Sequence, residues 1–274
     1  MINKNVFTDT HAHLDFPEFS QDLNATIDRA HISGVSRIIS IGTDLESSRR
    51  AIQLAEQFEG VFAVVGWHPS NVENAPDDIR PALRDLGKHP KVVAIGETGL
   101  DFYRLPSTRP TDTILDDGEY KKRQARLFSQ QLEIAQELGL NCVIHQRAAA
   151  QETLDQLRPF TPRVRGVFHC FVDSPDILRQ VLDLGSIVSF TGITTFKNAA
   201  GVRDTLATTP IEALMLETDC PYLAPVPYRG KRAEPAHVRE IAEIIAKIKS
   251  VTLEELSRIT ESTVERFFPK IVVE

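Results

Sequence analysis

The chain has 274 residues, of which 42% are hydrophobic and 25% are charged, the composition of a globular protein that needs no disulfide or metal in order to fold. Its 31 basic and 38 acidic residues give a formal net charge of −7. This charge argues against a protein that grips nucleic acid through a broad basic surface, but not against an enzyme that contacts a few phosphates inside a cleft. Three scattered cysteines exclude a disulfide framework, and no apolar run reaches signal-peptide length or the roughly 18 residues of a membrane span, so we expect a cytoplasmic protein.

Eight short, nearly continuous apolar runs alternate with longer stretches of helical pattern. Such runs are typical of parallel strands that are buried on both faces. The predicted strands are Val6–Thr10, Arg37–Gly42, Val61–Gly66, Val92–Glu97, Asn141–His145, Gly166–His169, Ser186–Phe190 and Ala213–Thr218.

Eight βα units are the number found in a (β/α)8 TIM barrel. An open doubly wound sheet could use the same elements, but no glycine-rich fingerprint follows the first strand. We predict one α/β barrel domain over residues 1–274, with an extra C-terminal helix that begins at the capping box Thr252–Glu255. The segment Leu105–Gly118, rich in Pro, Thr and Asp, is predicted to be a loop inserted after the fourth strand, either a lid over the cleft or a surface decoration.

Several predicted strands run into a histidine or a carboxylate at their C-terminal side. In a barrel these strand ends meet on one face, the face that carries active sites. Each residue alone is a weak signal, but their joint placement predicts a metal site. The six candidate ligands are His11, His13, Glu97, His145, His169 and Asp219.

Six ligands are more than one catalytic ion takes, since a catalytic zinc typically has three protein ligands and a water. They fit two divalent ions that share a bridging carboxylate, a role that suits Glu97. Asp219 is the best candidate to hold or deprotonate the attacking water, so we expect Asp219 and Glu97 to be catalytic. The metal is Mg, Mn or Zn, because nitrogen ligands admit Zn while phosphoryl chemistry often uses Mg or Mn. The three cysteines alternate with these ligands and are expected to be buried outside the barrel wall.

The stretches around these residues form a characteristic set. They are DTHAHLD at 9–15, GWHP at 66–69, IGETGLDFY at 95–103, VIHQR at 143–147, HCF at 169–171 and LETDCPYLAP at 216–225. From about residue 7 to residue 268 the chain resembles the TatD-type metal-dependent hydrolases (the TatD DNase family), a branch of the amidohydrolase-like superfamily.

This resemblance implies a distorted TIM barrel with a divalent metal site, and it implies the same six ligands. It also implies phosphodiester hydrolysis, typically a metal-dependent deoxyribonuclease of 3′–5′ exonuclease type. The alternative is a D-aminoacyl-tRNA deacylase or another amidohydrolase that cleaves an ester or amide, as some similar proteins are assigned. Ala148 stands where the family usually has an acidic residue, Gln146 replaces a common Ser or Thr, and Ala233 replaces a common Asn. None of these departures removes a ligand, but they leave the substrate contacts open.

Four further residues are predicted to bind substrate: His68, Arg147, Lys197 and Arg229. Phosphates need donors near the metals, and each of these residues lies close to a strand end. For each a structural role is the alternative: an ion pair for Arg147, a solvated loop for Arg229, a snorkelling cation for Lys197 and a structural hydrogen bond for His68.

Two aromatic residues lie near the strand ends, where an aromatic ring can stack a base. Tyr222 could stack one, whereas Trp67 is expected to pack in the core. The expected partners are DNA ends or another phosphodiester, or else aminoacyl-tRNA, and no membrane; the sequence does not indicate an oligomeric state. A non-catalytic barrel would have lost ligands, and a serine hydrolase would carry Gly-x-Ser-x-Gly after a strand, so neither class fits.

Overall fold

The structure is a computed structural model that describes residues 5–108 and 113–271. Within these residues eight parallel strands form one sheet, in which each strand pairs with the next along the chain. The strands are β1 (Phe7–Ala12), β2 (Val35–Ile41), β3 (Val61–Val65), β4 (Val92–Asp101), β5 (Asn141–Arg147), β6 (Gly166–Phe168), β7 (Ile187–Phe190) and β8 (Leu214–Leu216). All eight predicted strands are therefore present, and β1, β4 and β5 extend beyond their predicted ends.

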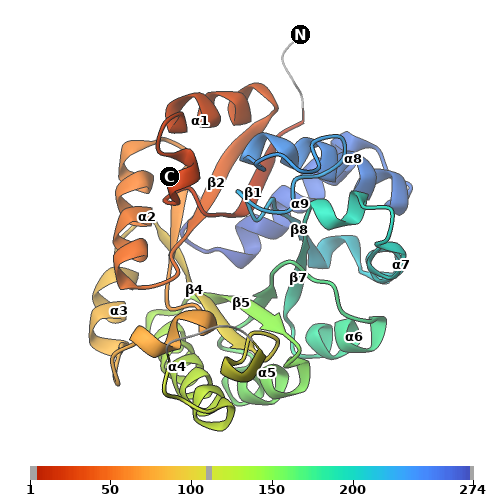
Figure 1. The fold of residues 1–274 in the computed structure, drawn as a ribbon. Helices are drawn as coiled ribbons and strands as arrows, with labels where there is room; N and C mark the ends of the chain where they lie inside the picture. Colours follow the sequence, from red (N-terminus) through yellow and green to blue (C-terminus); the bar gives the residue numbers. More distant parts are fainter. Residues whose placement is uncertain (1–4, 109–112, 272–274) are drawn as a thin grey trace.

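Helices surround the strands, and Figure 1 shows α1 to α8 placed in chain order around the barrel. They are α1 (Leu23–Ile32), α2 (Leu45–Gln57), α3 (Arg80–Gly87), α4 (Asp117–Leu138), α5 (Ala150–Leu157), α6 (Pro175–Asp183), α7 (Ala200–Thr208), α8 (Val238–Lys249) and α9 (Leu253–Phe267). Short 3-10 turns occur at η1 (Pro17–Phe19), η2 (Pro69–Asn74), η3 (Pro106–Thr108), η4 (Arg158–Phe160), η5 (Gly192–Thr195), η6 (Ile211–Ala213) and η7 (Pro235–His237). The predicted capping box is half present: the side chain of Thr252 accepts from the N–H of Glu255 and begins α9.

The barrel closes between β1 and β8, but not by a regular ladder. Strand β8 has only three residues, and a single bridge pairs Ala12 with Cys220. Around this bridge the backbones are joined by hydrogen bonds from the N–H of Asp219 to the carbonyl of His11, and from the N–H of His13 to the carbonyl of Cys220, both 2.9 Å. This irregular seam gives the distorted barrel that the sequence predicts, and it places three candidate ligands side by side.

Helix α9 lies across the N-terminal end of the barrel. Its residues Val264 and Phe267 pack, together with Phe268, onto the apolar side chains that fill the barrel interior. The amide of Asn141, at the start of β5, donates to the carbonyl of Phe267 at 2.6 Å. One end of the barrel is thus closed by packing. The polar strand ends gather at the other.

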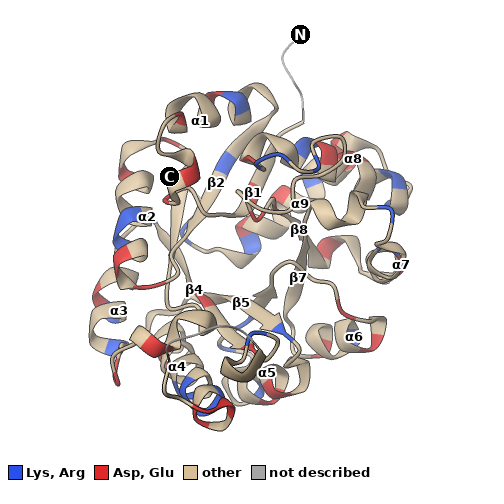
Figure 2. Cartoon of the chain, in the orientation of Figure 1, with Lys and Arg blue, Asp and Glu red and all other residues tan. Residues whose placement is uncertain are grey.

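The surface features considered in the sequence are the inserted segment 105–118, the charge of the outer helices and the absence of a membrane span. The inserted segment 105–118 is only partly covered, because residues 109–112 lie outside the described residues, and the lid remains a prediction. Acidic and basic residues are interspersed over the outer helices (Figure 2), and no broad basic surface was expected from the net charge of −7. Among the described residues no helix is both long and apolar enough to cross a membrane.

Candidate metal centre

The six candidate ligands meet at the C-terminal end of the barrel, as the sequence predicts. At the β1–β8 seam, His11 Nε2 lies 3.3 Å from His13 Nε2 and 3.7 Å from an oxygen of Asp219. The same Asp219 oxygen lies 3.5 Å from His13 Nε2. Asp219 follows β8 in a left-handed backbone conformation with φ of 56°, which turns the chain back across the barrel mouth.

Glu97, on β4, reaches the centre of the site and presents its two oxygens to two different groups. Its Oε2 lies 3.5 Å from His11 Nε2 and 3.8 Å from His13 Nε2. Its Oε1 lies 2.8 Å from His169 Nε2 and 2.9 Å from His145 Nδ1. Glu97 therefore stands between a first subsite at the seam and a second subsite at the ends of β5 and β6.

The spacing of these atoms fits divalent ions. Ligand atoms about 2.1 Å from a tetrahedral ion are about 3.4 Å apart, and those around an octahedral ion are about 3.0 Å apart. The first subsite has separations of 3.3 to 3.8 Å. The second has separations of 2.8, 2.9 and 3.1 Å, the last between His145 Nδ1 and His169 Nε2. The side chains of His11 and Glu97 are almost fully buried, so their mutual approach is enforced by the fold.

The electrostatics of the cluster are those of acids and bases held close together away from water. Although burial opposes ionisation, the surrounding imidazoles hold the pKa of Glu97 well below its usual range. Burial also opposes the charge of Asp219, yet His13 and its neighbours lower the pKa of this carboxyl. Against the same burial, Glu97 and Glu217 raise the pKa of His169 well above its ordinary value. Cations are therefore favoured at this position, and a metal ion would compete with protons for it.

Three buried carboxyl groups outside the six ligands orient them. Asp101, at the end of β4, lies 3.3 Å from His145 Nε2, so it can accept the proton that leaves Nδ1 free to bind metal. Glu217 accepts from the N–H of Cys170 at 2.5 Å and lies 3.7 Å from His169 Nδ1. Asp9 accepts from the N–H of His11 at 3.3 Å and from the N–H of Thr218 at 2.9 Å, which ties the two strands of the seam.

Sequence reasoning did not assign roles to these carboxylates. The signal was present for Asp9, which stands two residues before His11 in the same strand, because alternate residues of a strand share a side. Glu217 lies beyond the end of β8, where this alternation does not apply. Asp101 could have been found only by extending β4 to its real end.

His68 lies inside the cluster, close enough to Glu97 and His145 to hold an ion with them, but its hydrogen bonds differ from those of the six candidate ligands. Its Nδ1 accepts a hydrogen bond from the N–H of Ser70 at 3.0 Å, so in the neutral ring the proton is on Nε2. That Nε2 lies 3.3 Å from both Glu97 Oε1 and His145 Nδ1. Burial lowers the pKa of His68, which favours the neutral ring. His68 is thus a hydrogen-bond donor beside the site, whereas a metal ligand would need a free lone pair on Nε2.

A cavity of 640 Å³ opens over the cluster. Its lining includes His68 and Arg147, two of the four predicted substrate contacts, together with Arg104. The guanidinium of Arg147 lies 3.9 Å from the ring centre of Tyr103, and no described residue forms an ion pair with it. Lys197 and Arg229 are not among the lining residues. They lie on the loops after β7 and β8, where Arg229 stacks 3.8 Å from the ring of Phe196.

The positions of the cysteines confirm one prediction and correct another. Cys142 and Cys220 are buried in the layer between strands and helices, as expected. Cys170 instead lines the cavity, because β6 ends at Phe168 and Cys170 adopts φ of 48°, so the alternation of a strand no longer applies. Trp67 is buried with its Nε1–H donating to the carbonyl of Asn71 at 2.9 Å, which confirms its packing role.

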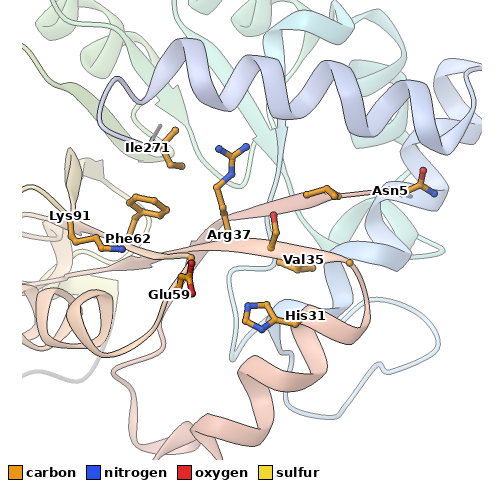
Figure 3. A pocket seen from close by; sticks show the side chains of 12 residues that line it. Asn5, His31, Val35, Arg37, Glu59, Phe62, Lys91 and Ile271 are labelled. Atoms are coloured by element: carbon orange, nitrogen blue, oxygen red, sulfur yellow. The ribbon is translucent and has the colours of Figure 1, made fainter. Parts of the chain in front are cut away.

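A second cavity, of 680 Å³, lies at the opposite end of the barrel (Figure 3). It is lined by residues at or just before the starts of β1 to β4, among them Val35, Arg37 and Lys91. Arg37 is occupied by hydrogen bonds to Glu261 and Glu265 of α9. Every group of described residues close enough to hold a metal lies at the other end, so we place the functional site there although its cavity is slightly smaller.

Comparison with known proteins identifies the family. The model of the family described as TatD related DNase matches residues 8–269. The chain belongs to the TatD family. It is 36% identical over 261 residues to the uncharacterized metal-dependent hydrolase YabD of Bacillus subtilis, covering 95% of this chain and 98% of YabD. It is 32% identical over 266 residues to the 3′-5′ ssDNA/RNA exonuclease TatD of Klebsiella pneumoniae, with 95% and 97% covered.

The solved structures agree with this assignment. The crystal structure of YJJV, a TatD homologue of Escherichia coli, superimposes with a TM-score of 0.87 at 29% identity, covering 98% of this chain and 99% of YJJV. The protein is therefore a metal-dependent hydrolase of the TatD family with a TIM-barrel fold.

Proposed function

We propose that this TatD-family hydrolase removes nucleotides from the 3′ ends of single-stranded nucleic acid, using two divalent ions held by His11, His13, Glu97, His145, His169 and Asp219. The observation that carries the proposal is the position of Glu97, whose two oxygens face two separate groups of nitrogen ligands. Paired ions that share a carboxylate suit the displacement of one oxygen by another at phosphorus. The exonuclease name of the Klebsiella relative supports the choice of substrate.

The ions, Mg, Mn or Zn, would supply Lewis acidity for the phosphoryl oxygens and lower the pKa of water. The protein holds the acceptor for that water's proton. Asp219 is kept ionised by the neighbouring imidazoles, and its side chain is 16% exposed at the cleft, so it can receive a proton from the nucleophile. Glu97 is more deeply buried and serves to fix the two subsites relative to each other.

Donors in the cavity lining near the second subsite would bind the substrate. The Nε2–H of His68 points at the second subsite and would donate to a non-bridging oxygen of the scissile phosphate. Arg147 is held in place by its stack on Tyr103 and faces the same cavity, so it would contact a flanking phosphate. Lys197 and Arg229 stay predictions as contacts to more distant parts of a strand. The cytoplasmic location also stays a prediction, made from composition.

The proposal is tested with purified protein loaded in turn with Mn, Mg and Zn. A 5′-labelled single-stranded oligonucleotide should be shortened stepwise from its 3′ end, and chelation with EDTA should stop the reaction. Glu97→Gln is the matched control, because it keeps the shape of the side chain and removes its charge. Intact DNA and RNA, together with release of D-amino acid from charged tRNA or cleavage of a simple ester, would instead support the deacylase alternative and overturn the proposal.

A further inference from the structure

The lining of the active-site cavity combines two kinds of side chain. Arg104 and Arg147 bring positive charge to it, and Arg147 follows His145 of the second subsite by two residues. Beside the first subsite Phe16 stacks on His13, and Tyr222 contacts Phe16, so these two rings form an aromatic wall. A phosphate is attracted to the arginines, whereas the aromatic wall offers flat apolar surface and fits an uncharged ring.

Tyr222 is held firmly in this wall. Its N–H donates to the carbonyl of Asp219 at 3.0 Å, so its backbone belongs to the same turn as that candidate ligand. The edge of its ring meets Phe16 at a centroid distance of 6.3 Å and an angle of 78°. Phe16 in turn stacks on His13 at 4.6 Å and 20°. The ring of Tyr222 is therefore tied to the metal centre through both backbone and side-chain contacts.

Tyr222 is nevertheless 52% exposed, so part of its ring is open at the cavity that it lines. Among the described residues the phenol hydroxyl makes no hydrogen bond, and the contact that fixes its loop is made by the backbone. A rigid, half-exposed ring beside the reacting centre is the arrangement that nucleic-acid enzymes use to stack an unpaired base.

We propose that Tyr222 stacks on the base next to the scissile phosphate and so selects nucleic-acid ends whose bases are unpaired. This inference rests on the proposed nuclease function and adds to it a specificity-determining residue. Stacking tolerates any base, because every base has a π face. We therefore expect Tyr222 to favour strands in which a base is present, whichever base it is. Loss of such a stack is expected to lower binding or kcat/KM by roughly 5- to 150-fold.

The test compares oligonucleotides with the same phosphates that differ in whether one base is present. One strand is normal, one lacks the 3′-terminal base and one lacks the penultimate base, each replaced by a tetrahydrofuran residue. Wild-type protein is compared with Tyr222→Phe, which keeps the ring, and with Tyr222→Leu, which keeps apolar bulk without a ring. Two quantities are measured: kcat/KM for the first cleavage with Mn, and affinity by fluorescence anisotropy of a 5′-labelled strand in EDTA.

We expect wild type and Tyr222→Phe to discriminate against one of the two abasic strands by roughly 5- to 150-fold, and Tyr222→Leu to discriminate by less than about twofold. Equal treatment of all three strands by wild type, or unchanged discrimination in Tyr222→Leu, overturns the inference. If wild type cuts no strand at all, the proposed function fails, but the anisotropy measurement still tests the stacking by Tyr222. A wild-type affinity that depends on the presence of a base, and that no longer does so in Tyr222→Leu, supports the stacking. A wild-type affinity that does not depend on the base overturns it.

Discussion

Replacing Asp101 by asparagine tests how the protein prepares His145 to bind a metal. One oxygen of Asp101 accepts from the N–H groups of Tyr103 and Arg104 at 2.9 and 3.0 Å, and the other lies 3.3 Å from His145 Nε2. Burial opposes its ionisation, but these donors, His145 first, lower the pKa of Asp101. It is therefore an acceptor at neutral pH and keeps the proton of His145 on Nε2.

An asparagine oxygen can keep the two backbone contacts, so the turn after β4 is expected to persist. The amide nitrogen then faces His145 and donates to its Nε2, which moves the imidazole proton to Nδ1, the atom that points at Glu97 and His169. The second subsite loses a lone pair without losing a residue. Loss of such an orienting carboxylate typically costs 10- to 100-fold in metal affinity or activity, which is about 1.4–2.7 kcal/mol.

Calorimetric titration of the metal-free protein with Mn or Zn measures this effect. For Asp101→Asn we expect one of two binding events to weaken by about 10- to 100-fold while the other changes less. Glu261→Gln is the control, because it removes a carboxylate that is largely buried at the other end of the barrel and should leave both affinities unchanged. Unaltered metal binding in Asp101→Asn, with circular dichroism of the wild type, would refute the reasoning about the tautomer.

Glu97→Gln is expected to lower kcat/KM by at least about 100-fold with the fold retained, since both subsites lose a charged oxygen. Full activity in this variant would contradict the assignment of Glu97 to the metal centre. His68→Ala is expected to lower kcat by roughly 100- to 1000-fold while calorimetry still finds the same number of ions, because its Nε2 is a donor; a lost ion would make it a ligand instead. Burial raises the pKa of Asp9 from 3.8 to about 8, so between these values the folded protein holds a proton that the unfolded chain has lost, and this contribution to stability falls as pH rises. The free energy of unfolding, measured with urea in EDTA, should therefore fall more for wild type than for Asp9→Asn between pH 6 and pH 8, by up to about 1.4 kcal/mol per pH unit. A difference between the two proteins that stays the same at both pH values would contradict the raised pKa of Asp9.

The sequence predicted the barrel and the six candidate ligands because both depend on local pattern and on one topological rule. Apolar runs mark buried strands, and parallel strands in a barrel bring their C-terminal ends together. Given that rule, residues as distant in sequence as His11 and Asp219 had to meet, and they do. The TatD motifs pointed to the same residues independently.

What the sequence could not supply are features that depend on backbone turns and on side-chain direction. Cys170 and Asp219 both have positive φ, so strand parity fails at both, and it was wrong for Cys170. The division of Glu97 between two subsites depends on where its two oxygens point. The tautomer of His68 depends on one backbone N–H two residues away. Arg229 and Lys197 carry charge near a strand end, but the path of each loop keeps them outside the cavity lining, and the sequence does not give that path.

The most direct test of the metal centre is anomalous diffraction from crystals of the protein grown with Mn. We predict two peaks about 3.5–4 Å apart on either side of Glu97, one contacting His11, His13 and Asp219 and the other contacting His145 and His169. A single peak, or peaks that Glu97 does not contact, would contradict the shared-carboxylate centre on which the proposed function depends.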